Sequence, residues 1–259
     1  MASPATKCLL ARGELSRLVK EVSARAYEKG ALLKFHSEER VLKEGSIDVQ
    51  MRILGSLEEK MNATKKQAGG EKRNPFLPYE EDLFVTELTP SHIVLLNKFA
   101  VLPDHGLIVT RDFVDQEEPL LLEDFVAIHL ALQEEDALVF FNCGRIAGAS
   151  QPHKHLQFIP LPLSLGSTAP HEPSETPLSH LIDEDLALLP GSDDLRRLEC
   201  FAFEHLLVKE RAPYHVDLIS EKASLEYAER HFSLYTSMLR HFARTLEAKE
   251  HPEAVFGFV

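Results

Sequence analysis

The chain has 259 residues, 44% of them hydrophobic and 27% charged, and a formal net charge of −13. This composition is ordinary for a soluble globular protein with a sizeable core. A strongly acidic protein repels nucleic acid and anionic membranes, so neither is an expected partner, and any polyphosphate site must be made locally positive. No apolar run approaches the roughly 20 residues of a membrane span. The three cysteines are widely spaced without a metal-binding motif, so we expect reduced thiols and a cytoplasmic protein.

The first predicted element is a helix over residues 13–29. Its apolar side chains repeat at helical spacing, and Gly30 follows as a stop. A second short amphipathic segment, which we take as helical, covers about residues 49–61. It leads into the most basic stretch of the chain, residues 60–73, which is either a solvated loop or a cationic flap over a polyphosphate.

A proline-containing segment, residues 74–79, predicts a rigid, extended turn before a strand that begins near Leu83. The next predicted strand, residues 91–101, carries the polar pair Asn97 and Lys98 inside an apolar run. A buried polar group without a partner costs about 1–3 kcal/mol. The pair therefore marks either a strand end that emerges into solvent or a binding site.

The middle of the chain alternates strands with one helix. A turn at residues 103–106 leads to a strand over 107–110, which gives a hairpin-like pair. Apolar residues predict a helix over about 122–130, and residues 137–141 predict a short strand buried on both faces. This order predicts an α+β fold with a largely antiparallel sheet flanked by helices.

The run from Asn142 to Ile159 concentrates the chemistry of the chain. Its two glycines let backbone approach a ligand, and the N–H groups between them can line an anion-binding concavity. In the strand that follows, His153, His155 and Gln157 alternate and so share a face. A neutral imidazole can attack phosphorus without a separate base, whereas glutamine is neither an acid nor a base. The pattern therefore favours transfer to an already ionised acceptor over hydrolysis.

Two other interpretations of the histidines stay open. Histidines two apart on a strand can be zinc ligands, although glutamine is a poor ligand and no nearby cysteine pair completes a site. Alternatively, His153 and His155 are hydrogen-bonded histidines of the core.

The segment Gly148 to Gln157, Gly-Ala-Ser-Gln-Pro-His-Lys-His-Leu-Gln, resembles the signature of the histidine triad superfamily. Glutamine in the third position matches its transferase branch, and the segment is most similar to the ATP adenylyltransferase (diadenosine tetraphosphate phosphorylase) family. The resemblance implies that His155, the second histidine, is a nucleophile that becomes transiently adenylylated. The implied reaction is cleavage of a diadenosine polyphosphate by inorganic phosphate to ADP and ATP.

The same resemblance implies a set of substrate-binding residues. It assigns nucleotide positioning to Asn97 and Lys98, and it makes Lys60 the candidate for a lysine that screens the distal phosphates. The remaining phosphate contacts are assigned to Asn142, Gly148, Ala149, Ser150, Gln151 and Gln157. No metal site and no cofactor is implied, although Mg²⁺ on the polyphosphate is expected.

The expected partners are a nucleotide substrate and inorganic phosphate, bound by a monomer or a homodimer. One alternative is a catalytically weakened protein that binds nucleotides for regulation. Another is a different nucleotidyltransferase, such as a hexose-1-phosphate uridylyltransferase.

We predict a single histidine-triad-like domain over residues 1–259. Residues 160–195 are rich in proline, serine and acids and predict a long connector, after which residues 199–208 read as a strand. Apolar residues spaced by three and four from Leu225 to Leu246 predict an amphipathic helix. The resemblance covers roughly residues 45–210, and the C-terminal part is shorter than the family's and lacks its tryptophan.

Overall fold

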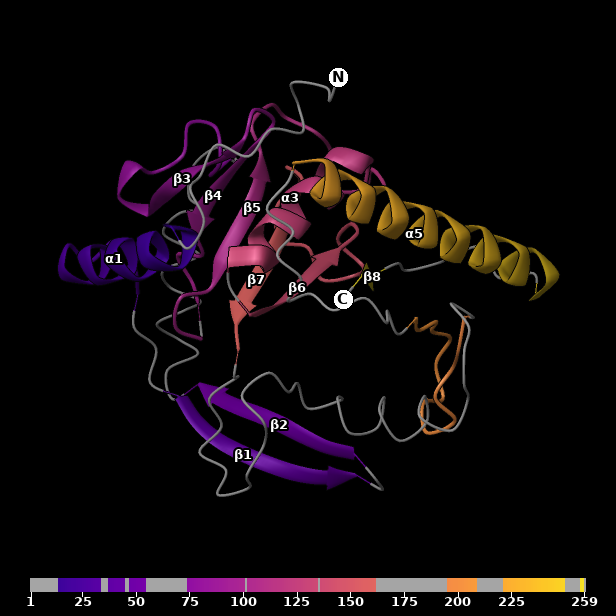
Figure 1. Cartoon of the computed structure of the whole chain (residues 1–259). Helices are drawn as coiled ribbons and strands as arrows, with labels where there is room; N and C mark the ends of the chain where they lie inside the picture. The colour runs from indigo at the N-terminus through magenta and orange to yellow at the C-terminus, as the bar shows by residue number, and fades with distance from the viewer. Residues whose placement is uncertain are drawn as a thin grey trace.

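The computed structural model describes residues 14–33, 37–44, 47–54, 74–100, 102–134, 136–161, 195–208, 221–249 and 257–258. These residues form a six-stranded sheet, a separate two-stranded sheet and helices that pack against the larger sheet (Figure 1). None of the described helices is both long enough and apolar enough to span a bilayer.

The larger sheet is antiparallel throughout. Its spatial order is β3-β4-β5-β7-β6-β8. Its strands are β3 (Phe84–Thr89), β4 (His92–Leu96), β5 (Gly106–Thr110), β6 (Ala137–Asn142), β7 (His155–Pro160) and β8 (Gly257–Phe258). The strand β7 lies between β5 and β6, although it follows both in sequence, because helix α3 (Leu122–Glu134) carries the chain past that position. The predicted α+β class is confirmed.

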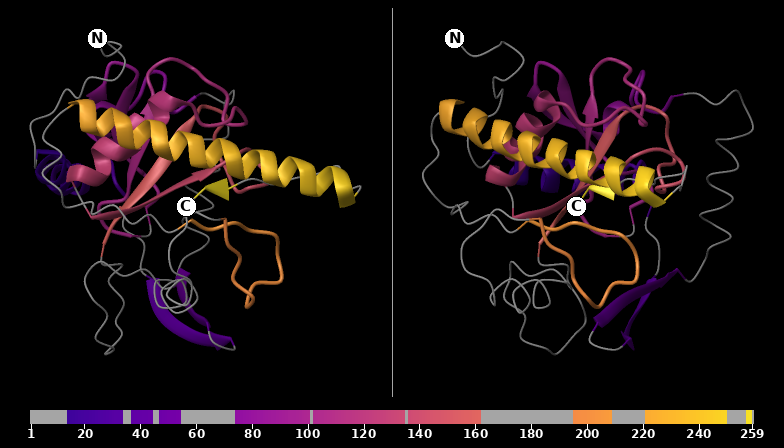
Figure 2. Two further views of the ribbon diagram at one scale, coloured as in Figure 1. Left: turned by 45° about the vertical axis from the view of Figure 1, so that its right-hand side comes forward. Right: turned by 90° about the vertical axis from the view of Figure 1, so that its right-hand side faces the viewer.

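Three helices cover one face of this sheet: α1 (Glu14–Glu28), α3 and α5 (Glu221–Lys249). Alternate strand residues such as Val94, Ile108 and Leu156 join the helices in the main core, because successive side chains of a strand point to opposite faces. The C-terminal part of α5 projects past the sheet (Figure 2). Both α1 and α5 were predicted from their apolar spacing, and both are confirmed.

The opposite face of the sheet carries a smaller apolar cluster. Its strand residues are Ile93, Leu95, Leu107 and Val109, and Phe76 packs on them. The segment that contains Phe76 is the predicted proline-containing turn, followed by a 3-10 helix, η2 (Glu81–Leu83). None of the three described α-helices packs on this face.

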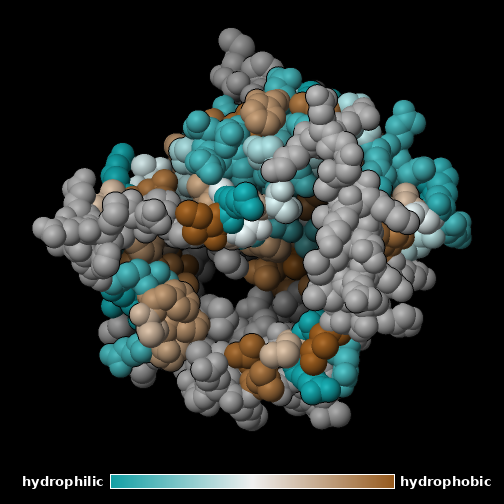
Figure 3. Space-filling view, turned by 180° about the vertical axis from the view of Figure 1, so that it is seen from behind, coloured by the Kyte–Doolittle hydropathy of each residue, from teal (hydrophilic) through white to brown (hydrophobic). Residues whose placement is uncertain are grey.

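The smaller sheet corrects a prediction. Residues 49–54, expected to be helical, belong to strand β2 (Ile47–Leu54), which pairs with β1 (Ser37–Glu44). Apolar and polar residues alternate along β2 with a period of two, and this pattern outweighs the loose helical spacing. Apolar side chains of the hairpin, among them Leu42 and Val49, are 37–47% exposed and colour its surface brown in Figure 3.

A second correction concerns residues 199–208, predicted as a strand. They form a loop closed by an isolated bridge between Arg196 and Leu207. Within it Phe201 and Phe203 stack with ring centroids 4.9 Å apart, so the aromatic residues pack on each other and not on a sheet. The basic stretch 60–73 and nearly all of the predicted connector lie outside the described residues.

Candidate active site

The side chains of His153, His155 and Gln157 lie on the helix-free face of the sheet, as their alternation predicts. The ring of Phe76 packs against both imidazoles, with centroid distances of 5.7 Å to His153 and 5.3 Å to His155. Further along β7, Oε1 of Gln157 lies 3.0 Å from Nε2 of His105. The buried strand therefore presents a row of polar groups next to an apolar wall.

The imidazole of His155 is held in one tautomer. Its Nδ1–H donates to the backbone carbonyl of His153 at 2.9 Å, so Nε2 carries the lone pair. Only 5% of His155 is exposed, yet Nε2 has no hydrogen-bond partner in the described structure and is not among its fully buried unpaired atoms. Burial lowers the pKa of His155, although the hydrogen bond to His153 opposes that shift. His155 is thus a neutral ring with a free nitrogen that is not sealed in.

The neighbouring His153 is fully engaged. Its Nε2–H donates to the carbonyl of Thr110 at 2.8 Å, with the carbonyl of Asp112 at 3.1 Å. Its Nδ1 accepts from the side-chain amide of Asn74 at 3.0 Å. Burial lowers the pKa of His153, and the hydrogen bonds to the two carbonyls partly offset this. With both nitrogens occupied, His153 serves as a support for His155.

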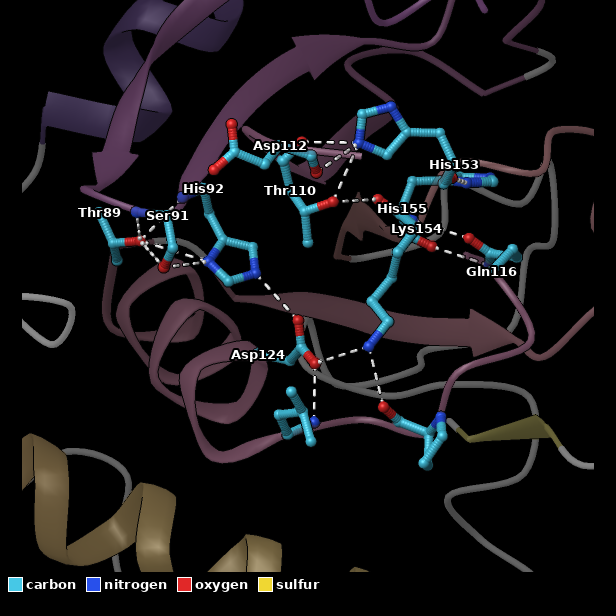
Figure 4. Close-up of polar contacts among 12 residues, drawn as sticks. Thr89, Ser91, His92, Thr110, Asp112, Gln116, Asp124, His153, Lys154 and His155 are labelled. Atoms are coloured by element: carbon cyan, nitrogen blue, oxygen red, sulfur yellow. Dashed lines mark hydrogen bonds and ion pairs between the residues drawn. The ribbon is translucent and has the colours of Figure 1, made fainter. Parts of the chain in front are cut away.

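A glutamine that the sequence did not single out holds the backbone of His155. Oε1 of Gln116 accepts from the backbone N–H of His155 at 2.8 Å. Nε2 of Gln116 donates to the carbonyls of Asn142 at 2.7 Å and His155 at 3.2 Å. Gln116 therefore joins the end of β6 to the start of β7, and Figure 4 draws its hydrogen bond with the backbone of His155. Its position 39 residues before His155, in an irregular segment, gave no local pattern to read.

The two glycines of the loop between β6 and β7 have positive φ angles, and the predicted anion binding by this loop stays a prediction. Gly144 and Gly148 have φ angles of 76° and 99°, a region that other residues rarely adopt. The backbone N–H of Ala149 donates to the carbonyl of Gly144 at 3.0 Å, which closes a tight turn. Asn142 lies beside this turn, with its amide nitrogen 3.7 Å from where a Cβ on Gly148 would stand. Ser150 follows at the surface and Gln151 is half-buried.

Asn97 and Lys98 lie just beyond the end of β4, half-buried, and each has a partner within the chain. Oδ1 of Asn97 accepts from the backbone N–H of Phe99 at 3.1 Å. Nζ of Lys98 pairs with the carboxylate of Glu80 at 2.7 and 2.8 Å. The structure thus places this pair at a strand end, and its nucleotide-binding role stays a prediction. Lys60, also predicted to bind substrate, lies outside the described residues.

Comparison with known proteins gives related sequences. Over 153 residues the chain is 35% identical to diadenosine 5',5'''-P1,P4-tetraphosphate phosphorylase 2 of Saccharomyces cerevisiae, covering 53% of this chain and 47% of the relative. Over 162 residues it is 28% identical to Protein APA1 of the same yeast, covering 58% of this chain and 50% of the relative. The chain spans about half the length of the curated relatives it matches.

Solved structures agree with the fold. The crystal structure of yeast Ap4A phosphorylase Apa2 matches with a TM-score of 0.51 and 29% identity, over 60% of this chain and 49% of that chain. The crystal structure of Apa2 in complex with Ap4A matches over 96% of this chain and 78% of that chain, with a TM-score of 0.63 and 21% identity. Because the identity is low, this match supports the fold alone.

A sequence profile of the Ap4A phosphorylase N-terminal domain matches residues 5–183, well over half of the chain and the whole of the site described above. The chain therefore belongs to the Ap4A phosphorylase N-terminal domain family.

Proposed function

We propose that this protein is a nucleotidyltransferase that cleaves diadenosine polyphosphates with inorganic phosphate, giving ADP and ATP from the tetraphosphate. The observation that carries the proposal is the state of His155. Its Nδ1–H is fixed on the carbonyl of His153, and its Nε2 has no hydrogen-bond partner among the described residues. Membership of the Ap4A phosphorylase N-terminal domain family supports the same substrate class.

In the first proposed step, the lone pair on Nε2 of His155 attacks the phosphorus that bears one adenosine. A nitrogen–phosphorus bond forms, the bond from that phosphorus to the bridging oxygen breaks, and ATP leaves with the bonding electrons. The proton on Nδ1 stays in place, where the carbonyl of His153 stabilises the positive ring. ATP is a good leaving group because its terminal phosphate is already acidic, so no general acid is required.

In the second proposed step, an oxygen of inorganic phosphate attacks the adenylyl phosphorus. The nitrogen–phosphorus bond breaks, ADP is released, and Nε2 regains its lone pair. Phosphate is ionised near neutral pH, so it attacks without a base. Gln157 fits this chemistry because its amide can orient a phosphoryl oxygen and cannot activate water. Its contact with His105 at 3.0 Å fixes that amide on the reactive face.

The substrate contacts remain those of the sequence prediction. The loop residues Gly148, Ala149, Ser150 and Gln151, with Asn142, are proposed to hold the phosphates near Nε2. The proposal gives nucleotide positioning to Asn97 and Lys98, and screening of the distal phosphates to Lys60. It treats Mg²⁺ as part of the polyphosphate substrate, and it places the reaction in the cytoplasm, in a monomer or homodimer.

The test is turnover of diadenosine tetraphosphate with and without ¹⁸O-labelled inorganic phosphate, with separation of the products by chromatography. The proposal predicts phosphate-dependent formation of equal amounts of ADP and ATP, with the label in the β-phosphate of ADP only. His155→Ala is expected to abolish both products.

Three outcomes contradict the proposal. Tight nucleotide binding without any product supports a regulatory protein. Cleavage at the same rate without phosphate, to AMP and ATP or to two ADP, shows hydrolysis. Exchange between a uridine diphosphate sugar and a hexose 1-phosphate, without cleavage of the tetraphosphate, shows a uridylyltransferase.

A further inference from the structure

The residue between the two histidines, Lys154, points to the opposite side of β7 and is buried. Only 1% of it is exposed. Its Nζ donates to the carbonyl of Pro119 at 2.8 Å and lies 3.4 Å from Oδ2 of Asp124 (Figure 4). Lys154 is therefore directed away from the face that bears the histidines, as the alternation of side chains in an extended segment requires.

Asp124, in the first turn of α3, is the centre of this buried network. Its Oδ1 accepts from Nε2–H of His92 at 2.9 Å, and its Oδ2 accepts from the backbone N–H of Leu121 at 2.7 Å. The other ring nitrogen of His92 accepts from the hydroxyl of Ser91 at 3.0 Å. Burial raises the pKa of Asp124, but His92, Lys154 and Leu121 together outweigh this effect and hold the pKa below its usual value. Asp124 is therefore a buried carboxylate opposite a buried ammonium.

Such a pair needs an explanation other than stability. Removing two charges from water costs several kcal/mol per ion, and apolar residues of similar volume often serve stability as well or better. The pair lies within the main core, where Leu88, Ile108 and Phe125 are fully buried. The best-attested use of buried polar groups is to fix one arrangement of elements among several. The question is which arrangement Lys154 and Asp124 fix.

They hold one end of the segment 112–121. Lys154 binds the carbonyl of Pro119, and Asp124 binds the N–H of Leu121. At the other end of the segment, the carbonyl of Asp112 contacts Nε2 of His153.

Between the two ends, this segment runs beside the strand that bears the histidines. The backbone N–H of Lys154 donates to the carbonyl of Val114 at 2.8 Å, and that of Gln116 donates to the carbonyl of Pro152 at 2.8 Å. The side chain of Gln116 then binds the backbone of His155. The buried pair therefore anchors the segment that carries Gln116, and Gln116 binds the backbone of the proposed nucleophile.

We infer that Lys154, Asp124 and His92 are positioning residues for His155, which act through segment 112–121 and Gln116. The inference rests on the proposed function for its catalytic meaning. It predicts a property of the free protein as well: the fixed tautomer of His155 depends on a side chain on the far side of the sheet.

The experiment compares ¹⁵N NMR spectra of ring-labelled histidine in the full chain, with the His155 signals assigned by their loss in His155→Gln. The wild type is expected to show Nδ1 protonated and Nε2 unprotonated. In Lys154→Met, which keeps a long apolar side chain in the same space, both nitrogens are expected to shift towards averaged values, because the ring samples both tautomers. Lys20→Met, at an exposed position of α1, is the control and is expected to match the wild type.

A second variant removes the contact of Gln116 with His155 without changing the buried charged pair. Gln116→Leu leaves Lys154 and Asp124 in place and is expected to give the same averaging of the His155 signals. If Lys154→Met does not fold, Lys154→Met combined with Asp124→Asn removes both buried charges and takes its place. If that variant fails as well, Gln116→Leu decides alone. Wild-type His155 signals in a folded Lys154→Met, in the double variant or in Gln116→Leu overturn the inference.

Turnover adds a readout that a purely structural role does not give. Folded Lys154→Met is expected to lose about tenfold or more in kcat with KM changed by less than about twofold, since substrate contacts lie on the other face. A change confined to KM contradicts a positioning role. If the wild type itself has no turnover, the proposed function fails, while the NMR comparison still decides whether Lys154 positions the ring.

Discussion

The backbone carbonyl of His153 lies 2.9 Å from Nδ1 of His155, and this contact selects the tautomer that leaves a lone pair on Nε2, the proposed nucleophile. His153 is in turn immobilised through both of its ring nitrogens. The first histidine of the motif thus acts through its backbone, and the second through its ring. Predictions about the two residues differ accordingly.

Removal of the imidazole at position 155 is expected to stop the proposed reaction and to be reversible by added imidazole. His155→Gly leaves space against Phe76 and is expected to lower kcat by on the order of a thousandfold or more, because the proposed nucleophile is removed. Free imidazole in the buffer is expected to restore part of the rate. Rescue is measured as phosphate-dependent ADP formation against imidazole concentration. A His155→Gly protein with wild-type kcat contradicts the assignment.

The pH dependence of the proposed reaction follows from the pKa of His155, which burial lowers from 6.5. The neutral ring attacks, so protonation inactivates it. We therefore expect kcat/KM to fall at low pH with a midpoint below 6.5, and the ring to remain neutral above that value. A pH–rate profile for diadenosine tetraphosphate tests this. A midpoint above 6.5 would show that a charged partner, not burial, governs the ring.

The hydrogen bond that holds the ring of His153 is expected to contribute to the free energy of unfolding. Asn74→Leu removes the donor to Nδ1 of His153 and leaves that buried nitrogen unpaired. It also removes the acceptor for the backbone N–H of Phe76. A buried polar group without a partner costs about 1–3 kcal/mol, so urea unfolding is expected to show a loss of that order. Asn74→Leu unfolding at the wild-type urea midpoint contradicts the described network.

Gly106 is expected to tolerate no side chain. A Cβ at this position in β5 would stand 2.1 Å from the ring of Phe158 on the paired strand β7. Gly106→Ala is expected to destabilise the protein by about 1–3 kcal/mol through overpacking next to Gln157. Phe158→Leu in the same chain is expected to relieve part of that loss, so the two effects are not additive. Additive changes in the urea midpoint would show that the close contact is absent.

Acid sensitivity of the fold is expected to arise between α3 and α5. Burial, with a contribution from His231, lowers the pKa of His129 from 6.5 to about 4. Between these values the unfolded chain binds a proton that the folded chain does not, so stability falls as pH drops through this window. His129→Leu is expected to lessen the fall, seen as a smaller change in urea midpoint between about pH 7 and pH 5. An unchanged pH dependence contradicts the neutral state of His129.

The parts of the fold that follow local rules were predictable. Helices α1, α3 and α5 and the shared face of His155 and Gln157 follow from periodicity, which depends only on neighbours in sequence. Residues 49–54 were mistaken for part of a helix because the alternation of apolar and polar residues along β2 is short, only eight residues, and was outweighed by a loose helical spacing over 49–61. The position of β7 between β5 and β6 depends on pairings between distant segments, which no local pattern records.

In the candidate site, too, the residues that are contiguous in sequence were predictable, and the contacts between distant residues were not. The motif gave His155, Gln157 and the glycine-containing loop because their chemistry is contiguous in sequence. Gln116 was missed because its role comes from a contact across 39 residues. The contact of Lys154 with Asp124 joins residues 30 apart in sequence, so no local pattern could show it. Burial of the Asp124 carboxylate likewise depends on how distant segments pack together.

The most direct test of the account is the site of covalent adenylylation. The protein is incubated with diadenosine tetraphosphate without phosphate, quenched in base, digested and analysed by mass spectrometry with fragmentation. The account predicts one adenylyl group on the ring of His155, lost in acid and discharged to ADP when phosphate is added before the quench. An adduct on His153 or elsewhere, or phosphate-dependent turnover with no adduct at His155, would contradict it.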